Sequence, residues 1–92
     1  MAYEVRSTPY FDREYKKLAK IQLALVHAAI DNVIERSDVG ELKSGDLSGC
    51  RVLKFKVLDR TFLLGYEVIG EIIYLQRIAS HENFYRDWKK NR

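Results

Sequence analysis

The most constraining feature of this 92-residue chain is a run from Thr61 to Ile69 that is almost continuously apolar. Central strands, covered on both faces, have this composition. Strand-like runs flank it on both sides, from Arg51 to Leu58 and, after a break at Gly70, from Ile72 to Ala79. Asp59-Arg60 reads as the first turn. Consecutive strands with such short connections favour an antiparallel three-stranded meander.

The first half of the chain predicts one strand followed by a helical hairpin. Tyr3–Ser7 alternates as a short strand does. Thr8-Pro9 then favours a helix start, because threonine can cap free amides and proline at the first helical position loses no hydrogen bond. The predicted helices run to about Lys20 and from about Ile21 to Arg36. Their apolar stripes contain Phe11, Tyr15 and Leu18 in the first helix, and Leu23, Val26, Ile30, Val33 and Ile34 in the second.

The remaining segments complete an α+β order. Ser37–Gly49 holds three glycines and several small polar residues, which predicts a loop without regular structure. Ser80 can cap a last helix that contains Phe84, Tyr85 and Trp88. We therefore expect one domain over residues 1–92, with a strand, a helical hairpin, the meander and a short C-terminal helix. The helices should lie on one face of a mainly antiparallel sheet.

Composition excludes several classes of protein. Apolar residues make up 47% of the chain and charged residues 32%. A chain of this composition is too charged to span a membrane and too apolar to be disordered. A lone cysteine, Cys50, fits a reducing compartment and reads as a small buried residue. The N-terminus lacks the pattern of a signal peptide. We expect a cytoplasmic protein that has no membrane association, no metal site and no cofactor.

The positive charge is concentrated in the second half. Residues 1–49 hold seven Lys/Arg against eight Asp/Glu, whereas residues 50–92 hold nine against five. A face that binds a polyanion is therefore expected in the second half.

A set of polar residues in that half suits RNA strand scission. Such a reaction needs groups that move protons, cations that stabilise a charged phosphate, and an aromatic ring that stacks on a base. The candidates are Lys54 and Lys56 on one face of a strand, Arg77 near the end of another, and His81, Glu82 and Tyr85 at the start of the last helix. Each also has a structural interpretation: the lysines as a solvated strand face, Arg77 as buried with a partner, and His81 and Glu82 as groups that favour a helix start.

Four passages together resemble the RelE/ParE superfamily of bacterial type II toxins. Tyr3–Ser7 with the segment FDREYKKLAK is similar to the family's first strand and "KLxK" helix. Residues 42–49 resemble its "LKG-LSG" loop, and Thr61–Ile69 its "YRLVYxV" central strand. Residues 80–89 are similar to the "GHRxxVY" ending in a variant "SHENFYRDxK" form. The order and spacing of the four passages make the resemblance specific.

The resemblance implies a toxin that a co-expressed antitoxin neutralises in a hetero-oligomeric complex. RelE-like members cut mRNA in the ribosomal A site without a metal, using the RNA's own 2′-hydroxyl, whereas ParE-like members inhibit DNA gyrase. Lys54 and Lys56 match the basic pair of the first meander strand. His81 matches the histidine of the ending, and Tyr85 the aromatic residue that stacks on mRNA.

The chain also departs from the family pattern. The arginine usual in the central strand aligns near Leu63, while Arg60 lies close in sequence. Glu82 stands where relatives have an arginine after the histidine. Glu41 lies one residue from a position at which some relatives have a carboxylate base.

The leading expectation is a ribosome-dependent mRNA endonuclease that inhibits translation. In this interpretation, His81 or Glu82 acts as acid or base, and Tyr85 holds the base. The groups that stabilise the phosphate are Lys54, Lys56 and Arg77. The alternatives are a gyrase inhibitor without nuclease activity and an inactive relative that only binds its antitoxin.

Overall fold

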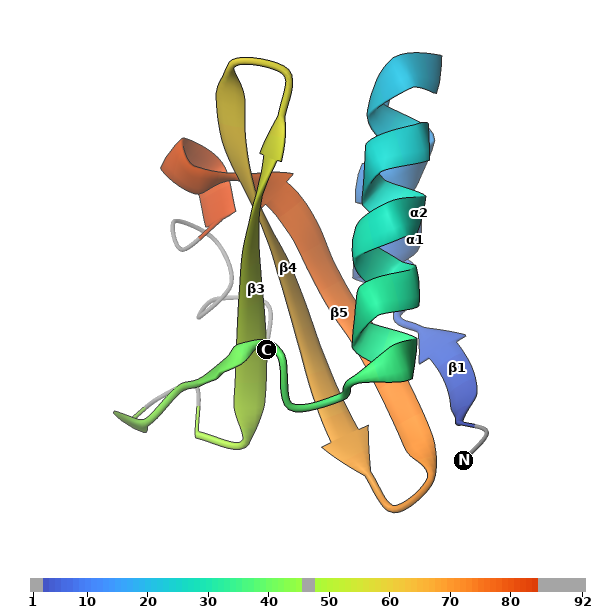
Figure 1. Ribbon diagram of the computed structural model, residues 1–92, viewed down its shortest axis with the longest axis vertical. Helices are drawn as coiled ribbons and strands as arrows, with labels where there is room; N and C mark the ends of the chain where they lie inside the picture. Colours follow the sequence, from blue (N-terminus) through green and yellow to red (C-terminus); the bar gives the residue numbers. More distant parts are fainter. Residues whose placement is uncertain (1–2, 46–47, 85–92) are drawn as a thin grey trace.

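The computed structural model describes residues 3–45 and 48–84 of the chain. The elements in order are β1 (Glu4–Ser7), α1 (Pro9–Lys16), α2 (Lys20–Glu35), β2 (Glu41–Leu42), β3 (Cys50–Val57), β4 (Arg60–Ile69) and β5 (Ile72–Ser80). A final helical turn occupies residues 81–84. Figure 1 shows α1 and α2 beside the long strands of the sheet. The predicted α+β class is confirmed.

The strands form one five-stranded sheet in the order β1-β5-β4-β3-β2. β3, β4 and β5 pair antiparallel, which confirms the predicted meander with the apolar run of β4 at its centre. β1 adds a parallel pair to β5, and the two-residue β2 pairs antiparallel with β3 at the opposite edge. The helical hairpin is thus the crossover between the first strand and the rest of the sheet.

The two faces of the sheet carry separate cores. The larger core joins α1 and α2 to the sheet, and among its buried members are Phe11, Val26, Val33, Tyr66 and Ile73. The smaller core consists of Cys50, Val52, Leu63 and Phe84. The helical hairpin therefore covers one face, as predicted, while Phe84 of the final turn packs against other residues of the sheet. Cys50 is fully buried, in agreement with its expected structural role.

The hairpin between the helices differs from its predicted boundaries. α1 ends at Lys16 rather than near Lys20, because the amides of Lys17 and Leu18 bond to carbonyls three residues back and tighten the last turn. Ala19 is extended, and the Gln22 side chain accepts a hydrogen bond from its amide at 2.8 Å. The break predicted near Lys20 therefore lies a few residues earlier, at residues 17–19.

Two further predictions about loops were wrong in detail. Ser37–Gly49 is not entirely irregular, because Glu41 pairs with Val52 of β3 to form β2. The β3–β4 turn consists of Leu58 and Asp59 rather than Asp59-Arg60. Leu58 has a φ of 59°, a conformation that leucine rarely adopts, so local sequence preference could not locate this turn.

A bulge interrupts the alternation of β5. Tyr66 pairs with Leu75 but Gly65 pairs with Arg77, so Gln76 is the additional residue. As a result Leu75 and Ile78 both belong to the larger core, although they are three positions apart. The bulge therefore changes the direction of every side chain after it, Arg77 included.

The first turn of α1 is fixed to β5 beyond the end of β1. The Thr8 hydroxyl accepts a hydrogen bond from the Phe11 amide at 3.1 Å, which confirms the predicted cap. The same hydroxyl donates to the Gln76 carbonyl at 3.2 Å, and the Thr8 amide donates to the Leu75 carbonyl at 3.1 Å. Thr8, at the start of α1, thus forms hydrogen bonds with the part of the β5 edge that lies beyond β1.

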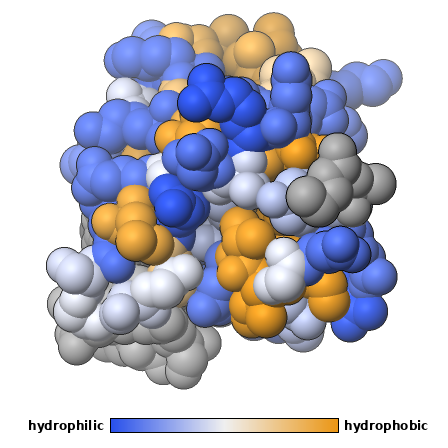
Figure 2. Space-filling view, turned by 60° about the horizontal axis from the view of Figure 1, so that its bottom comes forward, coloured by the Kyte–Doolittle hydropathy of each residue, from blue (hydrophilic) through white to orange (hydrophobic). Residues whose placement is uncertain are grey.

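The exposed apolar side chains are distributed over the surface. Figure 2 shows apolar patches separated by hydrophilic residues on one face of the molecule. The large exposed ones come from different elements and turns: Val5, Ile21, Leu42, Leu58 and Ile69. No helix within residues 3–45 and 48–84 is long and apolar enough to span a membrane.

Candidate functional site

An open groove with two lobes lies beside the smaller core. The first lobe, with a volume of about 470 Å³, is lined by Lys54, Asp59, Arg60, Thr61, Ser80, His81 and Glu82. The second, of about 660 Å³, is lined by Val39, Glu41, Lys43, Val52, Leu53, Lys54, Leu63 and His81. Lys54 and His81 line both lobes, so they mark the centre of what we call the groove. Three predicted site residues, Lys54, His81 and Glu82, meet here.

Strand alternation brings Lys54 to the groove but leaves its neighbour outside the lining. Val52, Lys54 and Lys56 share one side of β3, and Lys54 pairs with Leu63 in β4. Both lysines are exposed. Lys56 pairs with Thr61 closer to the turn and lines neither lobe. Lys54 therefore lines the groove and Lys56 does not, although the sequence pattern gave both lysines the same role.

The final turn carries His81 and Glu82 into the groove. The Asn83 side-chain amide donates to the Ser80 hydroxyl at 3.3 Å, and Phe84 is completely buried in the smaller core. These contacts hold the turn at both ends. Tyr85, the predicted stacking residue, lies outside the described residues.

The groove also contains groups that the pattern of residues alone did not single out. Arg60 lies in the first lobe, whereas the buried Leu63 of the same strand lines the second. Glu41 and Lys43 lie in the second lobe and form an ion pair at 2.8 Å. The hydrogen bond and charge of Lys43, with a smaller contribution from Lys54, hold the pKa of Glu41 below its usual value. Glu41 is therefore ionised at neutral pH.

The part of the groove that the structure describes brings no group of metal ligands together. Among the residues that the structure describes, no three His, Cys, Asp or Glu side chains are grouped as metal ligands. The charged and titratable groups that line the groove are the carboxylates, lysines, arginine and histidine already named.

A buried tyrosine fixes the loop that brings Glu41 to the groove. The Tyr66 hydroxyl accepts a hydrogen bond from the Gly40 amide at 2.9 Å and donates to the Ser37 carbonyl at 2.7 Å. Burial raises the pKa of this phenol, so it stays protonated and keeps donating. Arg51 donates to the Gly40 carbonyl at 2.8 Å. Tyr66 and Arg51 thereby set the position at which β2 begins.

Gly40→Ala is expected to lower the free energy of unfolding by about 1–3 kcal/mol, the usual cost of overpacking a filled site. A Cβ at position 40 would lie 2.7 Å from the Tyr66 hydroxyl oxygen and 2.8 Å from a ring carbon. The fully buried ring, which makes two hydrogen bonds, cannot withdraw. Urea denaturation measures this cost, and an unchanged midpoint would show that the loop is not held as described.

Arg77 occupies the interior rather than the groove. Its side chain is only 3% exposed, and its Nε forms an ion pair with Glu14 of α1 at 3.1 Å. Its guanidinium lies over the Tyr10 ring at 4.9 Å and over the Phe84 ring at 5.7 Å. The sequence was compatible either with burial of Arg77 beside a partner or with its use in a site. In the structure Arg77 is buried, and its partner is Glu14.

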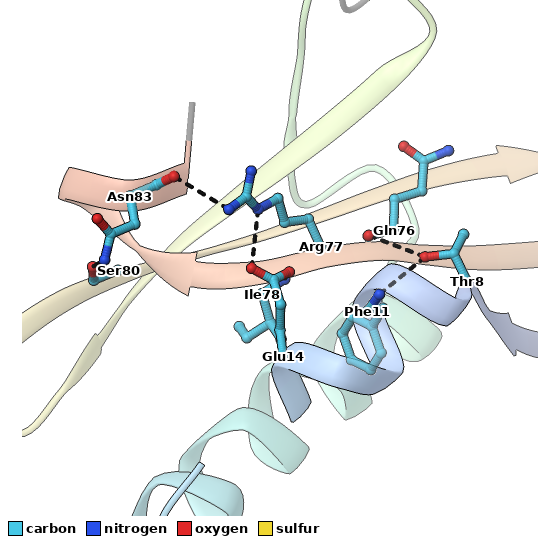
Figure 3. Close-up of polar contacts among 8 residues, drawn as sticks. All are labelled: Thr8, Phe11, Glu14, Gln76, Arg77, Ile78, Ser80 and Asn83. Carbon is cyan, nitrogen blue, oxygen red and sulfur yellow. Dashed lines mark hydrogen bonds and ion pairs between the residues drawn. The ribbon is translucent and has the colours of Figure 1, made fainter. Parts of the chain in front are cut away.

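Glu14 is the residue of this region that the sequence did not indicate. Its second carboxylate oxygen accepts a hydrogen bond from the Ile78 amide at 3.1 Å, so one side chain serves both the strand edge and Arg77 (Figure 3). Burial raises the pKa of the Glu14 carboxyl, whereas the Ile78 amide and the Arg77 charge act in the opposite direction.

Known proteins share this sequence pattern and this fold. The model of the ParE-like toxin of type II bacterial toxin-antitoxin systems matches residues 5–89. No curated protein matches the chain. Among solved structures, the E. coli RelBE toxin-antitoxin complex has a TM-score of 0.71 at 19% identity, over 85% of this chain and 95% of that one.

Two further solved structures give the same result. The RelBE2 toxin-antitoxin complex of Mycobacterium tuberculosis has a TM-score of 0.75 at 22% identity, over 88% of this chain and 100% of that one. The YoeB/ParE toxin of Agrobacterium tumefaciens has a TM-score of 0.64 at 14% identity, over 85% and 98%. At these identities the structures establish a common fold, and the match to the family model covers most of the sequence. The chain therefore belongs to the ParE-like toxins of type II bacterial toxin-antitoxin systems, within the RelE/ParE superfamily.

Proposed function

We propose that this toxin inhibits translation by cutting mRNA in the ribosomal A site, without a metal ion, in the cytoplasm. The observation that carries the proposal is the meeting of Lys54 and His81 at the centre of one open groove. An open groove with cationic and proton-transferring groups suits an extended single strand better than a small enclosed substrate.

The proposed reaction uses the RNA's own 2′-hydroxyl. This group loses its proton to a base, and its oxygen then bonds to the neighbouring phosphorus. The bond from phosphorus to the 5′-oxygen breaks as that oxygen takes up a proton, which leaves a 2′,3′-cyclic phosphate and a 5′-hydroxyl. Preorganised cations stabilise the negative charge that develops on the phosphate oxygens.

The groove residues can divide these roles. Ionised Glu41, which lines the second lobe, would accept the proton of the 2′-hydroxyl, and His81 or Glu82 would donate one to the leaving oxygen. Lys54 lies between these groups and would stabilise the charged phosphate. We propose that Lys56 binds the strand farther along its backbone and that Tyr85 stacks on a base.

Lys43→Met is expected to shift the acid limb of the activity profile to higher pH. Lys43 is the main cause of the lowered pKa of Glu41, so without it that pKa moves back up. A base must be ionised, and activity is lost as the pH falls through its pKa. The pH dependence of kcat/KM measures the shift, with the exposed Lys16 of α1 replaced by Met as the control. Identical acid limbs in Lys43→Met and the wild type would exclude Glu41 as the base.

We further propose a cognate antitoxin as the partner, in a hetero-oligomeric complex. Two of the similar structures are toxins bound to antitoxins, and another is RelE with an antitoxin peptide. An antitoxin segment with one apolar face could cover exposed apolar side chains and block the groove together.

Inhibition of DNA gyrase is the second candidate function. The family model that matches is that of a ParE-like toxin. The groove is also lined by three acidic residues, Glu41, Asp59 and Glu82, in addition to its basic ones. Its charge is therefore less positive than that of a surface that binds only RNA.

Induction of the toxin in growing bacteria separates these candidates. The nuclease proposal predicts that protein synthesis stops within minutes while DNA synthesis continues and no DNA-damage response begins. A damage response with continued protein synthesis would favour gyrase as the target. Normal growth at every expression level would indicate an inactive relative that only binds its antitoxin.

A further inference from the structure

The surroundings of Arg77 form a bridge between three parts of the fold. Its Nε is paired with Glu14 of α1, and its Nη2 donates to the Asn83 carbonyl of the final turn at 3.2 Å. Its own backbone belongs to β5. Figure 3 shows the guanidinium lying between the Glu14 carboxylate and the Asn83 carbonyl.

The bridge ends at the residue next to the groove, because Glu82 lines the first lobe and Asn83 follows it. Asn83 follows His81 and Glu82 directly in the chain, and its side chain returns to Ser80 at 3.3 Å. Phe84, over which the guanidinium lies, anchors the same turn in the smaller core. The orientation of His81 therefore depends on a turn that Arg77 holds by one hydrogen bond and one ring contact.

Arg77 itself is poorly suited to contact a substrate directly. Its side chain is buried, its charge is balanced by Glu14, and it lines neither lobe of the groove. Glu14 is itself mostly buried and bound to the Ile78 amide, so the pair cannot open without breaking the strand edge.

We propose that Arg77 and Glu14 are positioning residues, which act on the reaction only by holding the final turn so that His81 faces the groove. The inference rests on the function proposed above. A direct role and a positioning role of Arg77 predict opposite effects of Glu14. If Arg77 contacted the phosphate, removal of the Glu14 charge would leave more positive charge for the substrate and would preserve or increase cleavage. If Arg77 positions the turn, the same change lets the guanidinium move and reduces cleavage.

Glu14→Gln is the decisive variant, because glutamine has nearly the same size and retains an oxygen for the Ile78 amide. Two readouts are needed: the rate of ribosome-dependent mRNA cleavage, and the backbone amide order parameters of residues 81–84 by NMR. Thr8→Ala, which weakens the attachment of α1 to β5 without touching the turn, controls for lost stability. Glu35→Gln, at the exposed end of α2, controls for lost charge.

We expect Glu14→Gln to reduce cleavage by about tenfold or more, the effect of misplacing a proton-transferring group. The order parameters of residues 81–84 should fall from about 0.85, typical of a rigid backbone, towards values below about 0.6. Both controls should keep both properties. Arg77→Lys, which retains the charge but cannot reach Glu14 and Asn83 together, should lower the order parameters in the same way and provides a second variant if Glu14→Gln does not fold.

Unchanged or increased cleavage in Glu14→Gln would overturn the inference, as would unchanged order parameters in residues 81–84. If the wild-type protein cuts no mRNA, the proposed function fails, and the order parameters alone then decide whether the pair holds the turn.

Discussion

Glu14→Ala is expected to lower the free energy of unfolding by about 3–5 kcal/mol, the range found when one partner of a buried ion pair is removed. The substitution leaves the Arg77 guanidinium, 3% exposed, without its carboxylate, and the Ile78 amide without its acceptor. Domains of this kind have about 5–15 kcal/mol of total stability, so the variant should be close to its unfolding limit at physiological temperature. Urea denaturation followed by circular dichroism measures the change.

The double variant Glu14→Ala/Arg77→Met tests whether the lost stability comes from the unpaired charge of the buried Arg77. When the buried charge is removed as well, part of the loss should be recovered, because an apolar side chain in that position needs no counterion. A loss below about 1 kcal/mol in Glu14→Ala would be typical of an exposed pair and would contradict the described burial.

Lys54→Met is expected to reduce the rate of mRNA cleavage by about 10²–10³-fold, as for other single groups that stabilise transition-state charge. Lys54 lines both lobes of the groove and pairs with Leu63 of β4. Methionine keeps the length of the side chain and removes only its charge, and an exposed strand position tolerates the change, so folding should be unaffected.

Lys56→Met provides the matched control from the same strand and the same side. Lys56 is exposed but lines neither lobe, so its replacement should reduce cleavage by less than about tenfold, as for the loss of a single surface contact to a nucleic-acid backbone. Equal effects of the two substitutions would mean that general positive charge, and not the groove, determines activity.

Local patterns were sufficient to predict most of the fold. The apolar run of β4 and the alternation of β3 are properties of short segments, and each determines which side chains can be buried. The Thr8-Pro9 start of α1 was predictable for the same reason, since a cap involves residues only three positions apart. The two-residue β2 could not be predicted, because its pairing depends on where Tyr66 holds the preceding loop.

The candidate site was predictable only as a set of residue types. Lys54 and Lys56 look identical in the sequence, and only the surrounding sheet separates them. Glu14 and Arg77 are 63 positions apart, and the bulge at Gln76 alters the direction that simple alternation assigns to Arg77. Long-range pairs and strand irregularities of this kind have no signal in one sequence.

The most direct test of the proposed function is primer extension on a defined message in a purified translation system, with the wild-type toxin and with Lys54→Met. The account predicts cuts that appear only when ribosomes translate the message, that need no added metal beyond what translation requires, and that Lys54→Met largely abolishes. An intact message with normal translation, or equal cutting of RNA without ribosomes, would contradict it.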